Sequence, residues 1–243
     1  MNFSHVKFGR KIPKDRSYED KYCFKKMMAV PVKNVEKTLI VPLGLRSFYD
    51  QGDLGACVGF SSSWMMSIYN CNPQQKYDAV WLYRQAQLND GFDETNPPDD
   101  TGTVVSAAFW VLNHLGHKKI EENDPDINDG IMSYYWGQSS DDIRTAIAIG
   151  RPTVIGINWY SSFFEPEKIN GEYWIGRNPK KLGKMEGGHA ILGFSASDKK
   201  QSVELISTWG EDYPIVNLSY SMLDKLMAQD GEMCIGIDVP ASS

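Results

Sequence analysis

The sequence predicts an α+β fold in which a helical part precedes a part rich in antiparallel strands. Between residues 57 and 115, apolar residues recur every three or four positions, which is typical of helices that bury one face. From about residue 150 onward, short segments that alternate or run apolar over strand lengths follow one another. Helices first and strands later indicate a helical lobe that packs against a sheet lobe.

The whole chain is predicted to form one domain. No low-complexity tract, long run of charge or internal repeat divides the 243 residues. With 42% hydrophobic and 12% aromatic residues, the chain can bury a substantial core. We therefore expect a single domain over residues 1–243, with an extended N-terminal arm (1–50), a helical lobe (51–118) and a mainly β lobe (119–243). The arm is expected to be extended because prolines and glycines interrupt it at Pro13, Pro31, Pro42 and Gly44.

Three helices are predicted in the first half, over residues 57–71, 79–90 and 103–115. The second precedes Gly91 and the third precedes Gly116, and glycine is a good left-handed terminator. The first begins after a glycine-bearing turn and predicts one buried face made by Cys57, Phe60, Trp64, Ile68 and Cys71.

The second half is predicted to contain one short helix, five strands and a last helix. The helix over residues 140–149 carries acidic groups at its positive end. The last helix, over residues 221–228, is expected to be capped by Ser221. The predicted strands cover residues 153–158, 189–195, 202–208, 214–219 and 233–239.

Composition excludes several classes of function. A formal charge of −6 argues against a nucleic-acid partner, because phosphate binding depends on clustered Lys and Arg. No apolar run has the length of a secretory signal or a membrane span, so we expect a cytoplasmic protein without a membrane partner. Four widely spaced cysteines are too few for a disulfide framework and indicate free thiols. The oligomeric state stays open.

Two side chains have surroundings that suit catalysis. Cys57 opens a helix, where the dipole and free N–H groups favour a thiolate, although a free cysteine is more often a small buried hydrophobe. His189 follows Gly187 and Gly188 and begins an apolar strand, although a lone histidine is more often structural. Neither residue is persuasive alone. A metal site is not expected at the other histidine pair, His114 and His117, which lacks a third ligand.

Three motifs in order carry a resemblance to a known family. They are DQGDLGACVGFSSSW around Cys57, EGGHAILGFSAS around His189, and ISTWGEDYPIVNLSYSML around Ser207 and Trp209. The chain resembles the papain-like, or C1, cysteine peptidases, especially bacterial and phage members without a long inhibitory propeptide. His189 also lies 132 residues after Cys57, within the range of papain-type pairs. The early FGRKIPKDRSYEDKY is similar to the arm that precedes the cysteine motif in the bacterial group.

The resemblance implies a two-lobed papain-like fold, a helical lobe with the nucleophile helix, and a peptidase mechanism without metal or cofactor. His189 would take the Cys57 proton, and the thiolate would attack a carbonyl of a peptide or protein substrate and form an acyl-enzyme. Gln51, six residues before Cys57, would donate to the oxyanion together with the Cys57 N–H. Ser207 stands at the position of the family's asparagine, which orients the histidine.

Departures from the family pattern qualify what is expected. The hydroxyl of Ser207 is shorter than an asparagine side chain, which predicts a looser histidine and slower catalysis. Val58 and Leu54 differ from plant and animal members and fit an intracellular variant. Trp209 is interpreted either as a cover over the histidine or as a core aromatic. The residues expected to line the substrate cleft are Gly102, Gly156, Gly188 and Trp209.

Two alternatives to peptide hydrolysis remain. A catalytically weak or inactive module that binds a peptide or protein is suggested by Ser207. Isopeptide cleavage or acyl transfer on the same fold is the other, because a fold does not determine a reaction. The arm shows no amphipathic helix like that of an inhibitory propeptide, so we expect an active form that needs no maturation.

Overall fold

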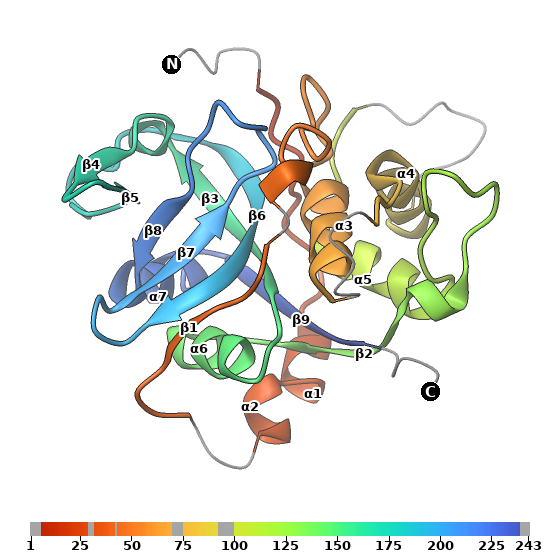
Figure 1. Cartoon of the computed structure of the whole chain (residues 1–243), viewed down its shortest axis with the longest axis horizontal. Helices are drawn as coiled ribbons and strands as arrows, with labels where there is room; N and C mark the ends of the chain where they lie inside the picture. Colours follow the sequence, from red (N-terminus) through yellow and green to blue (C-terminus); the bar gives the residue numbers. More distant parts are fainter. Residues whose placement is uncertain (1–5, 29–31, 42, 70–74, 92–99, 239–243) are drawn as a thin grey trace.

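A helical layer and a large sheet lie side by side in the computed structural model (Figure 1), which describes residues 6–28, 32–41, 43–69, 75–91 and 100–238. The helical lobe contains α3 (Cys57–Tyr69), α4 (Ala79–Asn89) and α5 (Val105–His114). Two further helices, α6 (Ser140–Ala148) and α7 (Tyr220–Met227), pack on the sheet. The structure therefore confirms the predicted α+β fold.

The described strands form one nine-stranded sheet in the order β2-β9-β3-β6-β7-β8-β5-β4, with β1 paired to β6. All neighbouring strands are antiparallel except β5 and β8. The bounds are β1 Glu36–Thr38, β2 Ile131–Trp136, β3 Thr153–Tyr160, β4 Glu167–Ile169, β5 Glu172–Ile175, β6 Met185–Ser197, β7 Ser202–Ile206, β8 Val216–Ser219 and β9 Glu232–Asp238.

Helix α3 is the centre of the helical lobe and is buried on every side. All thirteen of its residues are buried, which corrects the expectation of one buried face. The helix runs between α4 and strand β6, and a glycine permits the close approach to α4. A Cβ atom at Gly59 would lie 2.7 Å from the Ala79 carbonyl oxygen and 2.8 Å from the Tyr83 Cβ. The predicted end of this helix at Cys71 lies outside the described residues.

Several local predictions were wrong. The arm contains two short helices, α1 (Ser17–Lys21) and α2 (Phe24–Met27), which are too short to produce a helical period in the sequence. Strands β1, β2, β4 and β5 were not predicted; β1 and β4 have only three residues each. Helix α7 is capped by Ser219, whose hydroxyl accepts from the Met222 N–H at 3.2 Å, and not by Ser221.

No described helix combines the length and the apolar character that a bilayer crossing needs. In the same residues, no group of three His, Cys, Asp or Glu side chains is arranged to hold a metal ion. Cys23, Cys57 and Cys234 are free and buried.

His117 is a structural residue of the helical lobe. Its Nδ1 accepts from the Lys118 N–H at 2.8 Å, so the ring proton lies on Nε2, which donates to the Ser63 hydroxyl at 2.8 Å. The ring also stacks on Tyr77. Burial lowers the pKa of His117 to about 3, because a charged imidazolium is poorly solvated there.

This burial predicts acid destabilisation. The folded pKa lies below the unfolded value, so the unfolded chain binds the proton first, and the His117 contribution is lost as pH falls from about 6.5 toward 3. At pH 5 the loss amounts to about 2 kcal/mol. Denaturant unfolding between pH 5 and 8 should therefore show a shallower pH dependence for His117→Gln than for the wild type. If the free energy of unfolding changed equally with pH in both chains, His117 would not be the source of the acid destabilisation. His189 contributes equally to the wild type and to His117→Gln, so it does not affect the comparison.

Candidate active site

Cys57 is the first residue of α3 and lies against strand β6. The Ala190 N–H donates to the Cys57 sulfur at 3.4 Å, and the thiol is completely buried. One turn further along α3, the Ser61 hydroxyl donates to the Ala190 carbonyl at 2.9 Å. These two contacts tie the start of the helix to the strand segment that follows His189.

Burial dominates the electrostatics of the thiol. It raises the pKa of Cys57 to about 11, although N–H groups of Ala190, Gly9 and Val58 and the charge of Arg10 act in the opposite direction. The helix position alone would have predicted a lowered pKa. In this structure the thiol is therefore protonated at neutral pH.

His189 lies in β6 opposite Ile157 of β3. Its Nε2 is 3.0 Å from the Ser207 hydroxyl oxygen, so the serine side chain reaches the ring. Nδ1 is buried and has no hydrogen-bond partner among the described residues. Burial lowers the pKa of His189 to about 3, so the ring is neutral.

Aromatic rings enclose the imidazole. Trp209 stacks on His189 with ring centroids 4.4 Å apart, and Trp159 meets the ring edge to face at 4.9 Å. Phe8 from the N-terminal arm approaches both His189, at 6.4 Å, and Trp209, at 6.2 Å. Trp209 thus stacks on the His189 ring and also belongs to the apolar core.

Gln51 is buried in the turn before α3. Its Nε2 donates to the Leu54 carbonyl at 2.5 Å and to the Lys7 carbonyl at 3.1 Å. Its Oε1 accepts from the Thr208 hydroxyl at 2.5 Å. The two carbonyl groups fix which end of the amide is the donor, because a carbonyl oxygen can only accept. The amide donor is therefore directed toward the arm.

Residues 7–11 of the arm, called here the arm segment, run between the helical lobe and the sheet (Figure 1). The N–H of Gly9 in this segment meets the Cys57 sulfur. On the sheet side, the Arg10 N–H donates to the Gly188 carbonyl at 3.1 Å. On the helical side, the Thr103 N–H donates to the Gly9 carbonyl and the Lys11 N–H donates to the Thr103 carbonyl, both at 2.8 Å. The segment is thus an extended peptide whose main chain pairs with both lobes.

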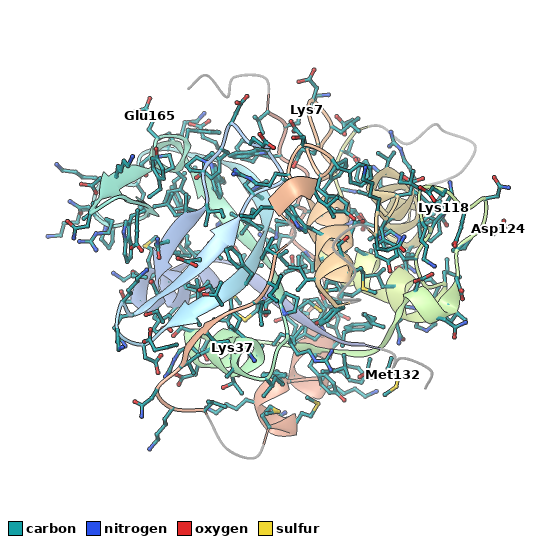
Figure 2. All side chains as sticks on the ribbon, viewed as in Figure 1. Lys7, Lys37, Lys118, Asp124, Met132 and Glu165 are labelled. Atoms are coloured by element: carbon teal, nitrogen blue, oxygen red, sulfur yellow. The ribbon has the colours of Figure 1, made fainter. Side chains whose placement is uncertain are left out.

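The arm segment fits closely because glycines line its path. A Cβ atom at Gly9 would lie 1.7 Å from the Gly55 carbonyl oxygen. One at Gly102, which has a φ of +77°, would lie 2.1 Å from the Gly9 carbonyl oxygen. Figure 2 shows the Lys7 side chain at the surface, near the loop that leads into α3. Only the middle of the segment is therefore fully enclosed.

Arg10 anchors the arm segment through a buried ion pair. Its Nε is 2.9 Å from Glu232 Oε2, and both side chains are 0% exposed. Its Nη2 also donates to the Asp230 carbonyl. Burial raises the pKa of Glu232 to about 7, while Arg10 acts in the opposite direction. Removing one member of such a pair costs about 3–5 kcal/mol when the other stays buried.

The structure brings most of the predicted site residues into one place. Cys57, His189, Gln51, Ser207 and Trp209 lie together, and Gly102, Gly156 and Gly188 all contact the arm segment. A separate surface cavity of about 480 Å³, lined by residues that include Tyr18 and Trp110, contains none of them.

Sequence reasoning missed the residues that fill the site. Phe8, Gly9 and Arg10 belong to the arm, and Glu232 follows Arg10 by 222 positions. No local pattern marks such a distant pair. The only available signal was the resemblance of the early FGRKIPKD segment to the arm of related proteins.

The fold is that of the papain-like cysteine proteases. Xylellain, a cysteine protease from Xylella fastidiosa, matches with a TM-score of 0.71 and 17% identity over 97% of each chain. Procathepsin B S9 from Trypanosoma congolense matches with a TM-score of 0.59 and 13% identity over 95% of this chain and 86% of that one. Procathepsin L 3 from the midgut of Tenebrio molitor larvae gives 0.55 and 12% over 96% and 74%. No model of a protein family and no curated protein matches the sequence.

The burial of Cys57 predicts that its thiol is alkylated slowly in the folded, intact chain. With a pKa of about 11, the thiolate fraction at pH 7.5 is far below that of an ordinary cysteine. Iodoacetamide should modify Cys57 at least about a hundredfold more slowly in the folded chain than after denaturation. Mass spectrometry of timed samples locates the label, with the unfolded chain as the internal reference. Rapid labelling of Cys57 in the folded chain would contradict this description of the site.

Proposed function

We propose that this chain is a cysteine peptidase with Cys57 as nucleophile and His189 as its base. Nδ1 of His189 takes the thiol proton while Ser207 holds Nε2, and the thiolate attacks a peptide carbonyl to form an acyl-enzyme that water hydrolyses. The amide of Gln51 and the N–H of Cys57 donate to the oxyanion. Trp209 keeps water from the imidazole. Gly102, Gly156 and Gly188 line the path of the substrate main chain.

One observation carries this proposal. The arm segment is an extended peptide that crosses the Cys57 sulfur and pairs its main chain with Gly188 on one lobe and Thr103 on the other. Main-chain pairing of this kind recognises extended peptides whatever their sequence. The position of the arm segment therefore supports a substrate that is a peptide or an unfolded part of a protein.

In the proposed enzyme the arm segment is an internal inhibitor. It leaves Cys57 and His189 fully buried and without charge, whereas the mechanism needs a thiolate beside an imidazolium. The structure therefore favours a covered resting form over the expected form that needs no maturation. Displacement or removal of the arm admits water and substrate, and this lowers the penalty on both charges.

A module that binds peptides without cleaving them would share part of this geometry. The Nδ1 of His189 favours it, because this atom has no hydrogen-bond partner, the Cys57 thiol included, in the part of the chain that the structure describes. Such bonds often form only when substrate is bound. Chemical reactivity of Cys57 in an uncovered chain separates the two proposals.

Gly9→Ala should uncover the site without changing a catalytic residue. The added methyl would meet the Gly55 carbonyl oxygen at 1.7 Å, and overpacking of this kind costs about 1–3 kcal/mol. The displaced fraction of the arm should rise about five- to a hundredfold. Modification of Cys57 by a peptidyl epoxide should accelerate by the same factor, measured by mass spectrometry across pH 5–9.

Gly44→Ala is the matched control, because a Cβ atom there meets no other atom within 4 Å. Its labelling rate should equal that of the wild type. Adding His189→Ala to Gly9→Ala should remove the reactivity near pH 6, where only a thiolate paired with an imidazolium reacts quickly. No acceleration in Gly9→Ala, or an acceleration that His189→Ala leaves unchanged, would favour the binding module.

Ser207 is expected to support the histidine in the uncovered enzyme. In the Gly9→Ala background, Ser207→Ala removes the hydrogen bond to Nε2 and should slow peptide hydrolysis about ten- to a hundredfold. Ser207→Thr keeps the hydroxyl and should retain most of the rate. The readout is kcat/KM against pH, since a misplaced imidazole also shifts the profile. If Ser207 only fills space, Ser207→Ala should change neither the rate of hydrolysis nor the pH profile of kcat/KM.

A further inference from the structure

Four basic side chains lie together on the loop between β5 and β6, residues 176–184, which is called here the basic loop. They are the exposed residues Arg177, Lys180, Lys181 and Lys184. Of these four, only Lys184 has an acidic partner in the part of the chain that the structure describes, Glu186 at 3.3 Å. The basic loop therefore presents unpaired positive charge on a chain whose formal net charge is −6.

Hydrogen bonds hold the main chain of the basic loop in one shape. The Lys181 N–H donates to the Asn178 carbonyl at 2.9 Å, and the Lys180 N–H donates to the side-chain oxygen of the same asparagine at 3.0 Å. The Ser161 N–H donates to the Lys184 carbonyl at 2.8 Å, and the Ser161 hydroxyl accepts from the Lys184 N–H at 3.1 Å. The basic side chains therefore extend from a fixed platform, so a partner that binds them has few main-chain torsions to order.

The short 3₁₀ helix η3 (Ser161–Phe164) connects the basic loop to the candidate active site. Its first residue holds the loop, and its last residue, Phe164, stacks on Trp209 with ring centroids 5.7 Å apart. Phe8 of the arm segment approaches the same Phe164 ring at 5.9 Å. A peptide that lies where the arm segment lies therefore passes one short helix away from the basic loop.

Acidic residues border the basic loop at both ends. Glu167 of β4 lies opposite Trp174 of β5, and the Arg177 guanidinium lies over the Trp174 ring at 5.0 Å. At the other end, the Glu186 carboxylate pairs with Lys184. The attractive surface between these acids therefore accommodates a short anionic segment and repels a long polyanion that would extend past either end.

A nucleic acid fits this surface less well than a polypeptide. Its phosphates continue along the strand and would meet the acidic residues that border the loop. Proteins also bind single strands by stacking bases on aromatic side chains, and residues 176–184 contain no aromatic residue. An acidic polypeptide segment, in contrast, can be as short as the basic surface itself. The net negative charge of the chain repels such a partner elsewhere and favours its approach at the basic loop.

We propose that the basic loop binds an acidic segment of a protein substrate and so selects substrates that carry such a segment near the cleaved bond. That the partner is a substrate rests on the proposed function, whereas the binding of an acidic polypeptide does not. The carboxylates of the segment accept hydrogen bonds from the lysine ammonium groups and the arginine guanidinium. Because all four bases are exposed, salt screens this attraction.

Binding is tested without catalysis, in the full chain with Cys57→Ser. Fluorescence anisotropy at about 50 mM salt measures the Kd of a labelled peptide of consecutive glutamates and of its glutamine counterpart of equal length. The chain is compared with the same chain carrying Lys180→Gln/Lys181→Gln, which leaves the main-chain bonds of the loop in place. The matched control is Lys25→Gln/Lys26→Gln, an exposed lysine pair on α2, which lies far from β5 in Figure 1. Both variants lose the same charge.

The glutamate peptide should bind, and Lys180→Gln/Lys181→Gln should raise its Kd about five- to thirtyfold, while the control on α2 changes it less than about twofold. Raising salt to about 300 mM should weaken the binding of the unsubstituted loop in the same direction. Equal Kd values for the glutamate and glutamine peptides, or equal weakening in both variants, would overturn the proposal. A single-stranded oligonucleotide of equal charge that binds more tightly, and loses this binding with Lys180→Gln/Lys181→Gln, would also overturn it.

Hydrolysis in the Gly9→Ala chain then tests the selection of substrates. Fluorogenic peptides share one cleavable sequence and carry a glutamate or a glutamine tail, placed before or after it. At one placement, kcat/KM should be about five- to thirtyfold higher with the glutamate tail, and Lys180→Gln/Lys181→Gln should bring this ratio to about one. Binding that depends on the two lysines, without hydrolysis of any peptide, would support the acidic partner and overturn the peptidase. Hydrolysis without a tail preference would support the peptidase and overturn the selection by the basic loop.

Discussion

The attachment of helix α3 to strand β6 determines the geometry of the whole site. The Ala190 carbonyl accepts a hydrogen bond from the Ser61 hydroxyl, and the Ala190 N–H donates to the Cys57 sulfur. One residue of the sheet lobe thus fixes the first turn of α3, where Cys57 lies, and its neighbour His189 is brought to the same place. The complete burial of α3 makes this attachment rigid, because a helix packed on every side has no free face along which to move. The two lobes therefore meet at a defined register.

Desolvation is the second consequence of this arrangement. The site lies between two lobes. A charged Cys57 thiolate and a charged His189 imidazolium are stable there only when water or a substrate reaches them. With the arm segment in place, burial holds the pKa of Cys57 at about 11 and that of His189 at about 3, so neither group is charged at neutral pH. In the proposed mechanism, the same low polarity strengthens the oxyanion donors once a substrate has replaced the arm. Inhibition and catalysis then differ mainly in which peptide is bound.

The fold and the catalytic candidates were predictable from the sequence because their signals are local. Helical spacing marks α4 and α5, apolar runs mark β3 and β6, and short motifs surround Cys57 and His189. The reach of the Ser207 hydroxyl was not predictable, because it depends on the positions of two neighbouring strands. Short strands such as β4 have too few residues to show an alternation.

The contents of the site were beyond sequence reasoning for a different reason. Arg10 and Glu232 are 222 residues apart, and a charged residue in an arm is usually solvated. Only the three-dimensional arrangement turns this pair into a buried contact. Likewise, a glycine at position 9 looks like one more flexible residue until the Gly55 carbonyl is found where its side chain would be.

If the proposed peptidase is correct, an inhibitor that lies across its site must avoid being cleaved, and the arm segment has two features that would protect it. The group that meets the Cys57 sulfur is the N–H of Gly9, so a donor and not an electrophilic carbonyl carbon faces the proposed nucleophile. The carbonyl that meets the amide of Gln51 belongs to Lys7, two residues away. The proposed oxyanion donor, Gln51, and the Cys57 sulfur therefore engage different peptide units, whereas hydrolysis would require both to act on one carbonyl. The arm can thus imitate the main-chain pairing of a substrate and still be a poor substrate itself.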